Sequence, residues 1–236
     1  MIELRGGQRP LVIGHRGAAA LAPENSLAAI EAGAAAGVDG VELDVLRARD
    51  GGLVLAHGPE IPPDAASLAA GLDLAREVGV FVQVDVKHRG VEADVVAALR
   101  DARLLERSFV SSFSLPSLVE FRRIAPGLPR SLTYPEDRLG VSGSPILRPL
   151  VRPGLAAMRL LLPRRLPRWL AAVDAAAVTL NWAVASPAVV AAGHRLGAAV
   201  YVWTVNDRDH AKILVETGVD AIITDDPRIV PGGTTT

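Results

Sequence analysis

Short strand-like runs alternate with alanine- and leucine-rich helical segments from one end of the chain to the other. Alternation of this kind favours a parallel sheet, and eight such units predict a single-domain α/β protein with the TIM (β/α)8 barrel fold. An open doubly wound sheet is the alternative, but no glycine-rich phosphate loop follows the first strand in the required form. The eight strand-like runs cover residues 11–14, 41–45, 81–86, 109–113, 130–134, 176–180, 200–205 and 221–224.

The bulk composition is compatible with one domain that spans residues 1–236. Half of the residues are hydrophobic, which is enough for a sizeable core, and the formal net charge of −1 gives no indication of nucleic-acid binding. The absence of cysteine excludes disulfides and a cysteine nucleophile. The N-terminal sequence lacks the apolar run of a signal peptide, and no uncharged apolar stretch of about 18 residues occurs. We therefore expect a cytoplasmic protein without a transmembrane helix.

Polar residues stand at the carboxyl ends of the predicted strands, where barrel enzymes build their active sites. A core built for stability alone does not need polar side chains at one strand end after another. The pattern therefore predicts an active site at this end of the barrel. The residues concerned are His15, Arg16, Glu42, Asp44, Asp85, Lys87, Ser111, Ser112, Tyr134, Asn181, Trp203 and Asp225.

Three of these residues are carboxylates on neighbouring strands. Glu42 and Asp44 are two residues apart, so both side chains point to the same face of one strand, and Asp85 lies near the end of the next. Like charges at this distance repel one another. A hard divalent cation such as Mg²⁺ or Ca²⁺, which prefers oxygen ligands, offsets that repulsion. The alternative is a structural network in which Arg16, Lys87 or another arginine neutralises the acids.

Two histidines follow strand-like runs. His15 follows the first strand, and His57 ends an additional run at 52–57 that we expect to pair near the end of the second strand. Because imidazole titrates near neutral pH, the two are candidates for a general acid and a general base. A structural position at the barrel rim is the alternative for each of them. His194 and His210 lie on helical patterns and are predicted to be surface residues.

Basic and aromatic residues also gather at the predicted strand ends. Arg16 and Lys87 suit an anion such as a phosphate, and neutralisation of the acids is a second role that is compatible with the first. Trp203 ends the seventh strand and either walls a substrate pocket or caps the barrel core. Residues 23–26 precede a helix and are interpreted as its N-terminal cap.

Six stretches of the sequence match, in the same order, those of a known enzyme family. In these stretches the chain resembles the glycerophosphodiester phosphodiesterases. The resemblance implies a TIM barrel and metal-dependent hydrolysis of a glycerol-linked phosphodiester to glycerol 3-phosphate and an alcohol. The stretches are GHRGAAALAPENS (14–26), GVELDVLRARDGGLVLAH (40–57), VDVK (84–87), SSF (111–113), VWTVN (202–206) and GVDAIITDDP (218–227).

The resemblance also implies roles for individual residues. One divalent cation, Mg²⁺ or Ca²⁺, would be held by carboxylates, two histidines would form the acid–base pair, and two cationic side chains would hold the phosphate. The implied ligands are Glu42, Asp44 and Asp85, the implied acid–base pair is His15 with His57, and the implied phosphate-binding residues are Arg16 and Lys87.

Three features depart from the usual pattern of this family. Asp85 stands where family members usually have glutamate, and its shorter side chain affects the distance to a metal or the choice of metal. Gly58 follows His57 where an aspartate is usual, so an orienting carboxylate is lost. Only 27 residues (58–84) separate His57 from Asp85, so most of the small lobe that many family members carry there is missing.

Residues 138–173 contain seven arginines and no acidic residue. Together with several leucines, Met158 and Trp169, they suit peripheral contact with an anionic membrane surface or with the lipid part of a substrate. The alternative is a core-packed helix with a solvated arginine face that Pro163 and Pro167 interrupt.

Other functions stay open at this point. A lysophospholipase D-like enzyme would act on lysophospholipids, which keep one acyl chain. A phospholipase D of the sphingomyelin-cleaving kind shares the two-histidine barrel, but those enzymes are typically secreted with disulfides, which a chain without cysteine does not form. A catalytically weak barrel that binds a lipid or a phosphate is the alternative from a different class.

Overall fold

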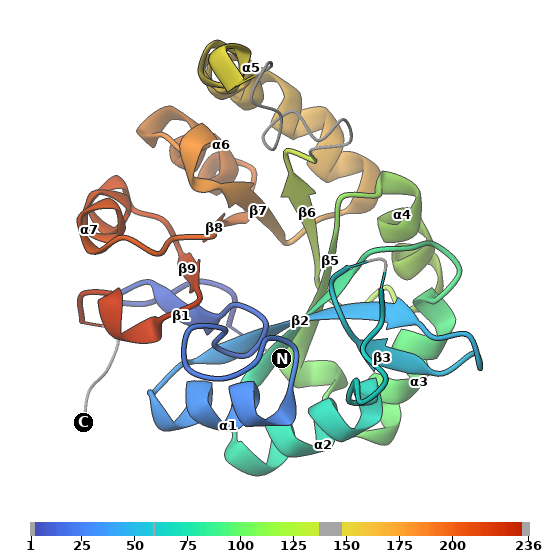
Figure 1. Ribbon diagram of the computed structural model, residues 1–236. Helices are drawn as coiled ribbons and strands as arrows, with labels where there is room; N and C mark the ends of the chain where they lie inside the picture. The colour runs from blue at the N-terminus through green and yellow to red at the C-terminus, as the bar shows by residue number, and fades with distance from the viewer. Residues whose placement is uncertain (1–2, 59, 137–147, 233–236) are drawn as a thin grey trace.

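A computed structural model of the chain describes residues 3–58, 60–136 and 148–232, with the side chains of 148–152 left out. Eight parallel strands close into a barrel, because β1 pairs with both β9 and β2 (Figure 1). The predicted TIM barrel is therefore confirmed. The strands are β1 (Leu11–Gly14), β2 (Gly40–Arg47), β3 (Leu53–Leu55), β4 (Phe81–Val86), β5 (Ser108–Ser112), β6 (Arg130–Tyr134), β7 (Ala177–Asn181), β8 (Ala199–Trp203) and β9 (Ala221–Thr224).

The ninth strand, β3, lies outside the closed barrel. It pairs antiparallel with the end of β2, where Val45 lies opposite Leu55, as the sequence predicted for the run 52–57. This hairpin carries the chain back toward the barrel mouth and delivers His57 two residues after β3 ends. Helix α2 begins at Leu68, so a short loop connects β3 to α2 in place of an inserted lobe.

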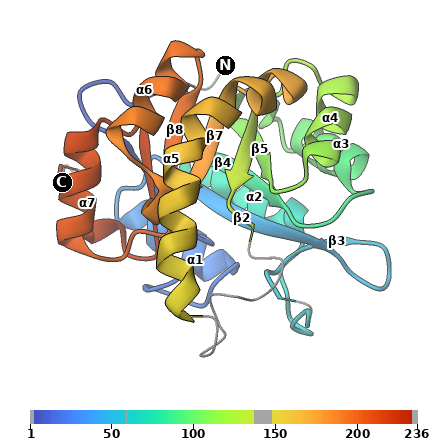
Figure 2. The ribbon, with the colours of Figure 1, turned by 90° about the horizontal axis from the view of Figure 1, so that it is seen from above.

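Seven α-helices of the described residues surround the barrel (Figures 1 and 2). Most begin at a serine or aspartate whose side chain accepts a backbone hydrogen bond, such as Ser67 and Asp207. Two end at glycines with positive φ, Gly79 at 82° and Gly218 at 83°. The helices are α1 (Leu27–Ala35), α2 (Leu68–Val78), α3 (Glu92–Asp101), α4 (Leu115–Ile124), α5 (Arg148–Val173), α6 (Pro187–Arg195) and α7 (Arg208–Thr217).

The two faces of the barrel strands have different chemistry. On β2, Val41, Leu43 and Val45 belong to the apolar cluster that packs under the helices, whereas the alternating Glu42 and Asp44 point the other way. All five side chains are buried. Alternation in a strand that is covered on both faces therefore places the two carboxylates inside the barrel.

The barrel interior is apolar near the start of the strands and polar near their ends. An apolar cluster fills the lower part, in which Phe109 packs edge-on against Tyr201 with ring centroids 5.4 Å apart. The Tyr201 hydroxyl donates a hydrogen bond to the backbone oxygen of Leu4 at 2.7 Å, so the N-terminal segment closes this end. The polar layer above is thereby shielded from solvent on one side and opens toward the other.

Helix α5 differs from the prediction that Pro163 and Pro167 interrupt the segment. The helix is continuous through both prolines. Packing of Leu162, Leu166 and Leu170 on the barrel outweighs the lost backbone hydrogen bonds. Residues 138–147 of the predicted basic segment lie outside the described residues. Among the helices that are described, α5 included, none combines the length and the apolar character needed to cross a membrane.

Candidate active site

Three buried carboxylates converge at the polar end of the barrel. Parallel pairing of β2 with β4 places Asp44 directly beside Asp85, and Glu42 lies two residues earlier on β2. Their exposed fractions are 4% for Glu42, 0% for Asp44 and 3% for Asp85. One oxygen from each lies within 4.8 Å of the others. The structure therefore brings the three predicted metal ligands together.

Lys87 and Arg16 supply positive charge to this cluster. The Lys87 Nζ lies 2.5 Å from Asp44 Oδ1 and also contacts Asp85. The Arg16 Nε lies 3.2 Å from Asp44 Oδ2, and the Arg16 backbone N–H donates to Glu42 Oε2 at 2.9 Å. Both cations thus neutralise acids, as one of the two predicted roles requires.

The balance of burial and charge differs among these groups. Burial, followed by the negative charge of Asp44, raises the pKa of Glu42 well above its ordinary value. Burial acts in the same direction on Asp44, but Lys87, Asn25 and Arg16 together outweigh it and lower the pKa of Asp44. Burial opposes the charge of Lys87, yet Asp85 and Asp44 raise the pKa of Lys87. Asp44 and Lys87 are therefore charged in the folded protein.

The carboxylate cluster fits a divalent cation. Ligand oxygens that bind one Mg²⁺ or Ca²⁺ at about 2.0–2.6 Å are at most about 5 Å apart, which the separation of 4.8 Å satisfies. The donors are all oxygen atoms, as a hard cation prefers. The residues present therefore suit the group that the resemblance implies.

Asp85 has its own set of hydrogen-bond partners inside the barrel. The Ser111 hydroxyl donates to Asp85 Oδ1 at 2.5 Å, and Thr133 Oγ1 lies 3.4 Å from the same oxygen. Gln83 Nε2 in turn donates to Ser111 Oγ at 2.9 Å. Ser111 was predicted at a strand end without a role, and this contact gives it one: it fixes the orientation of Asp85.

Asn25 is a residue of the site that the sequence analysis did not identify. Its Nδ2 donates to Asp44 Oδ2 and its Oδ1 accepts from the Asp44 backbone N–H, both at 3.0 Å. Asn25 is buried and has a φ of 55°, a region that asparagine adopts more readily than most residues. Within the predicted cap, Ser26 alone caps α1, accepting from Ala29 N at 3.1 Å. Asn25 lies in the loop before α1 and its side-chain partner Asp44 lies on β2, so local sequence gave no signal for the contact.

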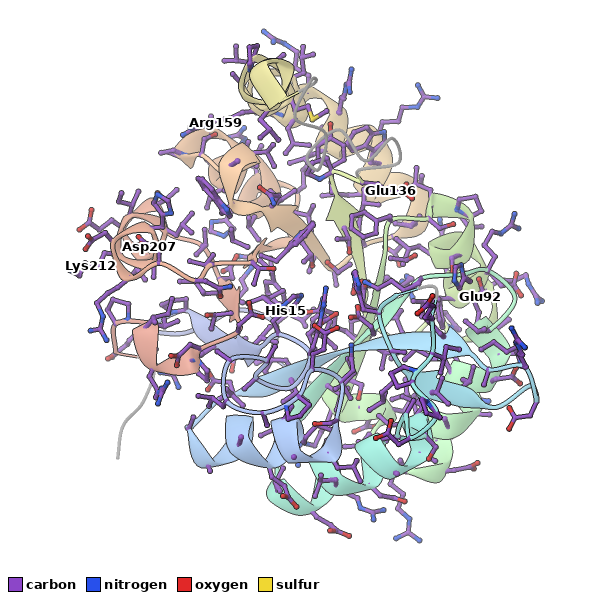
Figure 3. All side chains as sticks on the ribbon, viewed as in Figure 1. His15, Glu92, Glu136, Arg159, Asp207 and Lys212 are labelled. Atoms are coloured by element: carbon purple, nitrogen blue, oxygen red, sulfur yellow. The ribbon has the colours of Figure 1, made fainter. Side chains whose placement is uncertain are left out.

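The two predicted catalytic histidines lie at the same cavity but have different partners. His15 Nδ1 lies 2.6 Å from Asp225 Oδ1, and Figure 3 shows His15 at the centre of the barrel mouth. Asn206 donates to the other oxygen of Asp225, and Asp225 N donates to Asn206 Oδ1 at 3.0 Å. Burial raises the pKa of Asp225, but the contacts with His15 and Asn206 and the charge of Arg16 together outweigh it, so the pKa is lowered. Asp225 thus holds His15 in one orientation.

His57 is held less tightly. Partial burial, with the nearby charges of Arg16 and Lys87, lowers the pKa of His57 below its ordinary value against the opposing effect of Asp44. The residue that follows, Gly58, offers no side chain to orient the ring. His57 is therefore a neutral imidazole near pH 7.

A cavity of about 120 Å³ joins these groups. Trp203 lines it and also packs on the apolar cluster below. Its ring meets Phe113 edge-on with centroids 5.9 Å apart, and its Nε1 donates to Thr179 O at 3.3 Å. The cavity is lined by His15, Arg16, Glu42, His57, Gln83, Asp85, Lys87, Phe113, Thr133, Thr179, Trp203, Thr204 and Ile223.

Other residues at the predicted strand ends have structural contacts. Ser112 Oγ donates to Val86 O at 2.7 Å. Tyr134 packs against Trp169 with ring centroids 5.2 Å apart, and Asn181 caps the short helix at 182–184. Position at a strand end therefore does not by itself make a residue part of the cavity.

The histidines predicted on helices lie away from the cavity. His210 is exposed and stacks on Trp182 with ring centroids 4.6 Å apart. His194 is partly exposed, and its Nε2 lies 2.7 Å from Asp220. Both therefore lie at the surface of the molecule.

A closed parallel barrel with buried carboxylates and two histidines at its mouth defines a TIM-barrel protein with an acidic site suited to phosphate-ester chemistry. The sequence matches the Glycerophosphoryl diester phosphodiesterase family over residues 15–63 and 62–229. The chain therefore belongs to this family of hydrolases.

Individual relatives agree with this assignment. A glycerophosphodiester phosphodiesterase from Caldanaerobacter subterraneus subsp. tengcongensis is 26% identical over 93% of this chain and 95% of the relative. A solved structure of a candidate glycerophosphoryl diester phosphodiesterase from Silicibacter pomeroyi DSS-3 has a TM-score of 0.78 and 26% identity, covering 96% of this chain and 93% of the other. An Oleispira antarctica phosphodiesterase, solved with the product sn-glycerol-3-phosphate, has a TM-score of 0.72 and 20% identity over 95% and 96% of the two chains.

Proposed function

We propose that this protein hydrolyses glycerophosphodiesters to glycerol 3-phosphate and an alcohol at the mouth of the barrel. The observation that carries the proposal is one cavity lined by two histidines, two cations and two buried carboxylates. A third buried carboxylate, Asp44, lies within 4.8 Å of the other two. Membership of the family and the relative solved with sn-glycerol-3-phosphate support this class of substrate.

Glu42, Asp44 and Asp85 would hold one divalent cation, Mg²⁺ or Ca²⁺. When bound, such an ion supplies Lewis-acid stabilisation of negative charge on phosphoryl oxygens. Asn25 keeps Asp44 in place, and Ser111 keeps Asp85 in place. Asp44 and Asp85 are thus oriented before a cation binds.

The two histidines would share the proton transfers. The lowered pKa of His57 keeps its imidazole neutral near pH 7, which suits acceptance of a proton from water or from a neighbouring glycerol hydroxyl. His15, oriented through Nδ1 by Asp225, would use Nε2 to protonate the leaving alkoxide. His15 is held by Asp225 and His57 is held less tightly, which matches these two tasks.

Arg16, Lys87 and Trp203 would bind the substrate. Arg16 and Lys87 line the cavity beside the carboxylates, so their positive charge is available to a phosphate there. Trp203 and Phe113 form the apolar part of the wall, against which the carbon skeleton of the substrate would pack.

The test is release of glycerol 3-phosphate from glycerophosphocholine in Mg²⁺, Ca²⁺ or EDTA. We expect activity with a divalent cation, none in EDTA, and a loss of at least about 100-fold in His15→Ala and in His57→Ala. His210→Ala, at an exposed position on α7, is the matched control and keeps full activity. Undiminished turnover in EDTA, or in both cavity histidine variants, would contradict the proposal.

A lysophospholipase D-like activity is the second candidate. The short loop between β3 and α2 and the apolar wall of Trp203 and Phe113 favour it, because both make room for a substrate with an acyl chain. The product to follow is choline from lysophosphatidylcholine, measured beside the first assay. Choline release without turnover of glycerophosphocholine would select this second function.

A further inference from the structure

Helix α5 presents one face to the barrel and the opposite face to solvent. Leu162, Leu166, Leu170 and Val173 are buried at intervals of three or four residues. Residues on the opposite side of the helix are exposed, among them Leu160 at 73% and Leu161 at 41%. This exposed side, called the α5 outer face below, consists of Ala156, Ala157, Leu160, Leu161, Arg164, Arg165 and Arg168.

The arginines of the α5 outer face have no acidic partner among the described residues. The segment 138–173 contains no Asp or Glu, and within the part of the chain that the structure describes no ion pair reaches the three arginines of this face. Arg165 instead lies over the ring of Trp169, 5.8 Å from its centroid. By contrast, Arg123 on α4 pairs with Glu120. The charge of the outer face is therefore available to an external anion.

The position of the helix places this face on the outside of the barrel. β6 ends at the mouth of the barrel and β7 starts at the opposite end, so α5, which joins them, runs from the mouth down the outside of the barrel (Figure 2). Its 26 residues span about 39 Å. A basic surface with projecting leucines therefore lies on the outside of the barrel, from Ala156 to Arg168, over about 18 Å of that length.

We propose that the α5 outer face docks on the surface of a bilayer that contains anionic phospholipids. Arginine guanidinium groups would contact lipid phosphates, while Leu160 and Leu161 would enter the boundary between head groups and acyl chains. A second copy of this chain is a poorer partner, because a symmetric interface would bring the arginines of one face against those of the other. The bilayer supplies negative charge for the arginines and an apolar layer for the leucines of this face.

Docking does not depend on the proposed hydrolysis. No residue of the α5 outer face lines the cavity that holds the histidines and carboxylates. His15→Ala should therefore bind vesicles as the unchanged protein does, even where turnover is lost. Failure of the proposed reaction and failure of the proposed docking can thus be told apart.

The experiment is co-sedimentation with vesicles of phosphatidylglycerol and phosphatidylcholine in equal parts, beside vesicles of phosphatidylcholine alone. We expect binding to the anionic vesicles that weakens as salt rises. The triple variant Arg164→Ser, Arg165→Ser, Arg168→Ser should lose on the order of 100-fold in partition coefficient. Leu160→Ser should weaken binding at constant charge, since it removes the projecting apolar side chain.

The matched control is the triple variant Arg49→Ser, Arg100→Ser, Arg195→Ser. It removes three charges from exposed positions on other elements, so both triples change the formal net charge from −1 to −4. The control should bind anionic vesicles within about twofold of the unchanged protein. Equal binding by the two triples, equal binding to neutral vesicles, or a dimer in light scattering that Leu160→Ser dissociates would each overturn the proposal.

Discussion

Single residues hold the carboxylate cluster in place, and Asp85 shows how. Ser111 donates to one of its oxygens at 2.5 Å while Lys87 contacts the other. The hydroxyl of Ser111 therefore decides where the shorter aspartate side chain presents its oxygens. This contact matters most in a chain that has aspartate at this position.

Replacement of Ser111 by alanine should weaken binding of a divalent cation by about 10-fold, because partners of metal ligands contribute on that scale. The measurement is the dissociation constant for Mn²⁺ by calorimetry, which needs no turnover. Ser108→Ala is the control on the same strand, since Ser108 is equally buried and its hydroxyl has no hydrogen-bond partner within the described ranges. Equal losses in both variants would show that Ser111 has no special role.

Asp225 orients His15 and should matter for rate more than for binding. Asp225→Asn keeps the size of the side chain but changes which proton the His15 ring carries. We expect kcat to fall by on the order of 100-fold with little change in KM. Asp226→Asn is the neighbouring control, because Asp226 pairs with Arg228. A rise in KM with kcat unchanged would argue against an orienting role.

The same residue makes a pH-dependent contribution to stability. His15 lowers the pKa of Asp225 in the folded protein, so the pair stabilises the fold above the ordinary carboxyl pKa of about 3.9. That contribution is lost as the pH falls through the lower, folded-state pKa. The difference in Tm between the unchanged protein and Asp225→Asn should therefore be present at pH 6 and shrink below about pH 4. A difference that grows on acidification would contradict this sign.

At the scale of elements, the loop between β1 and α1 carries His15 and Arg16 against the first helix. A side chain at Gly33 of α1 would place its Cβ 2.5 Å from the backbone oxygen of Gly17. Gly17 itself has a φ of 94°, which a residue with a Cβ adopts only with strain. Close contact between loop and helix is thus part of how the site is positioned.

Two helical glycines test this contact. Alanine normally favours a helix over glycine by about 1 kcal/mol, and Gly154 of α5 has open space around its Cβ position. We expect Gly154→Ala to stabilise the protein by up to about 1 kcal/mol. Gly33→Ala should instead destabilise it by about 1–3 kcal/mol, because the added methyl meets backbone. Urea unfolding measures both, and stabilisation by Gly33→Ala would disprove the close packing.

The elements were more predictable from sequence than the contacts between them. Alternating strand and helix patterns predicted the barrel, and carboxylates at neighbouring strand ends predicted the cluster of Glu42, Asp44 and Asp85. The partner of Asp44 at Asn25 was missed, because it is a long-range contact between an asparagine in a loop and a strand. The continuity of α5 was also missed, because tertiary packing of its leucines overrides the local effect of proline.

For the whole molecule, a bound cation should stabilise the fold. A ligand at 100 times its dissociation constant adds about 2.7 kcal/mol, which for a chain of this size corresponds to a rise in Tm of about 5–10 °C. We expect this rise with Mg²⁺ or Ca²⁺ and its reversal by EDTA, measured by differential scanning fluorimetry. Asp44→Asn should abolish the rise, whereas Asp73→Asn, at a surface ion pair on α2, should retain it. No rise in the unchanged protein would exclude a metal site in the barrel.

Barrel closure joins the first strand to the last, and His15 and Asp225, 210 positions apart, meet at that seam. During synthesis the ribosome makes His15 210 residues before Asp225. A nascent chain therefore carries all three carboxylates and both histidines well before His15 has its partner. The His15–Asp225 contact therefore forms only when β9 joins the barrel. A protease that removes β9 and Asp225 is expected to inactivate the enzyme.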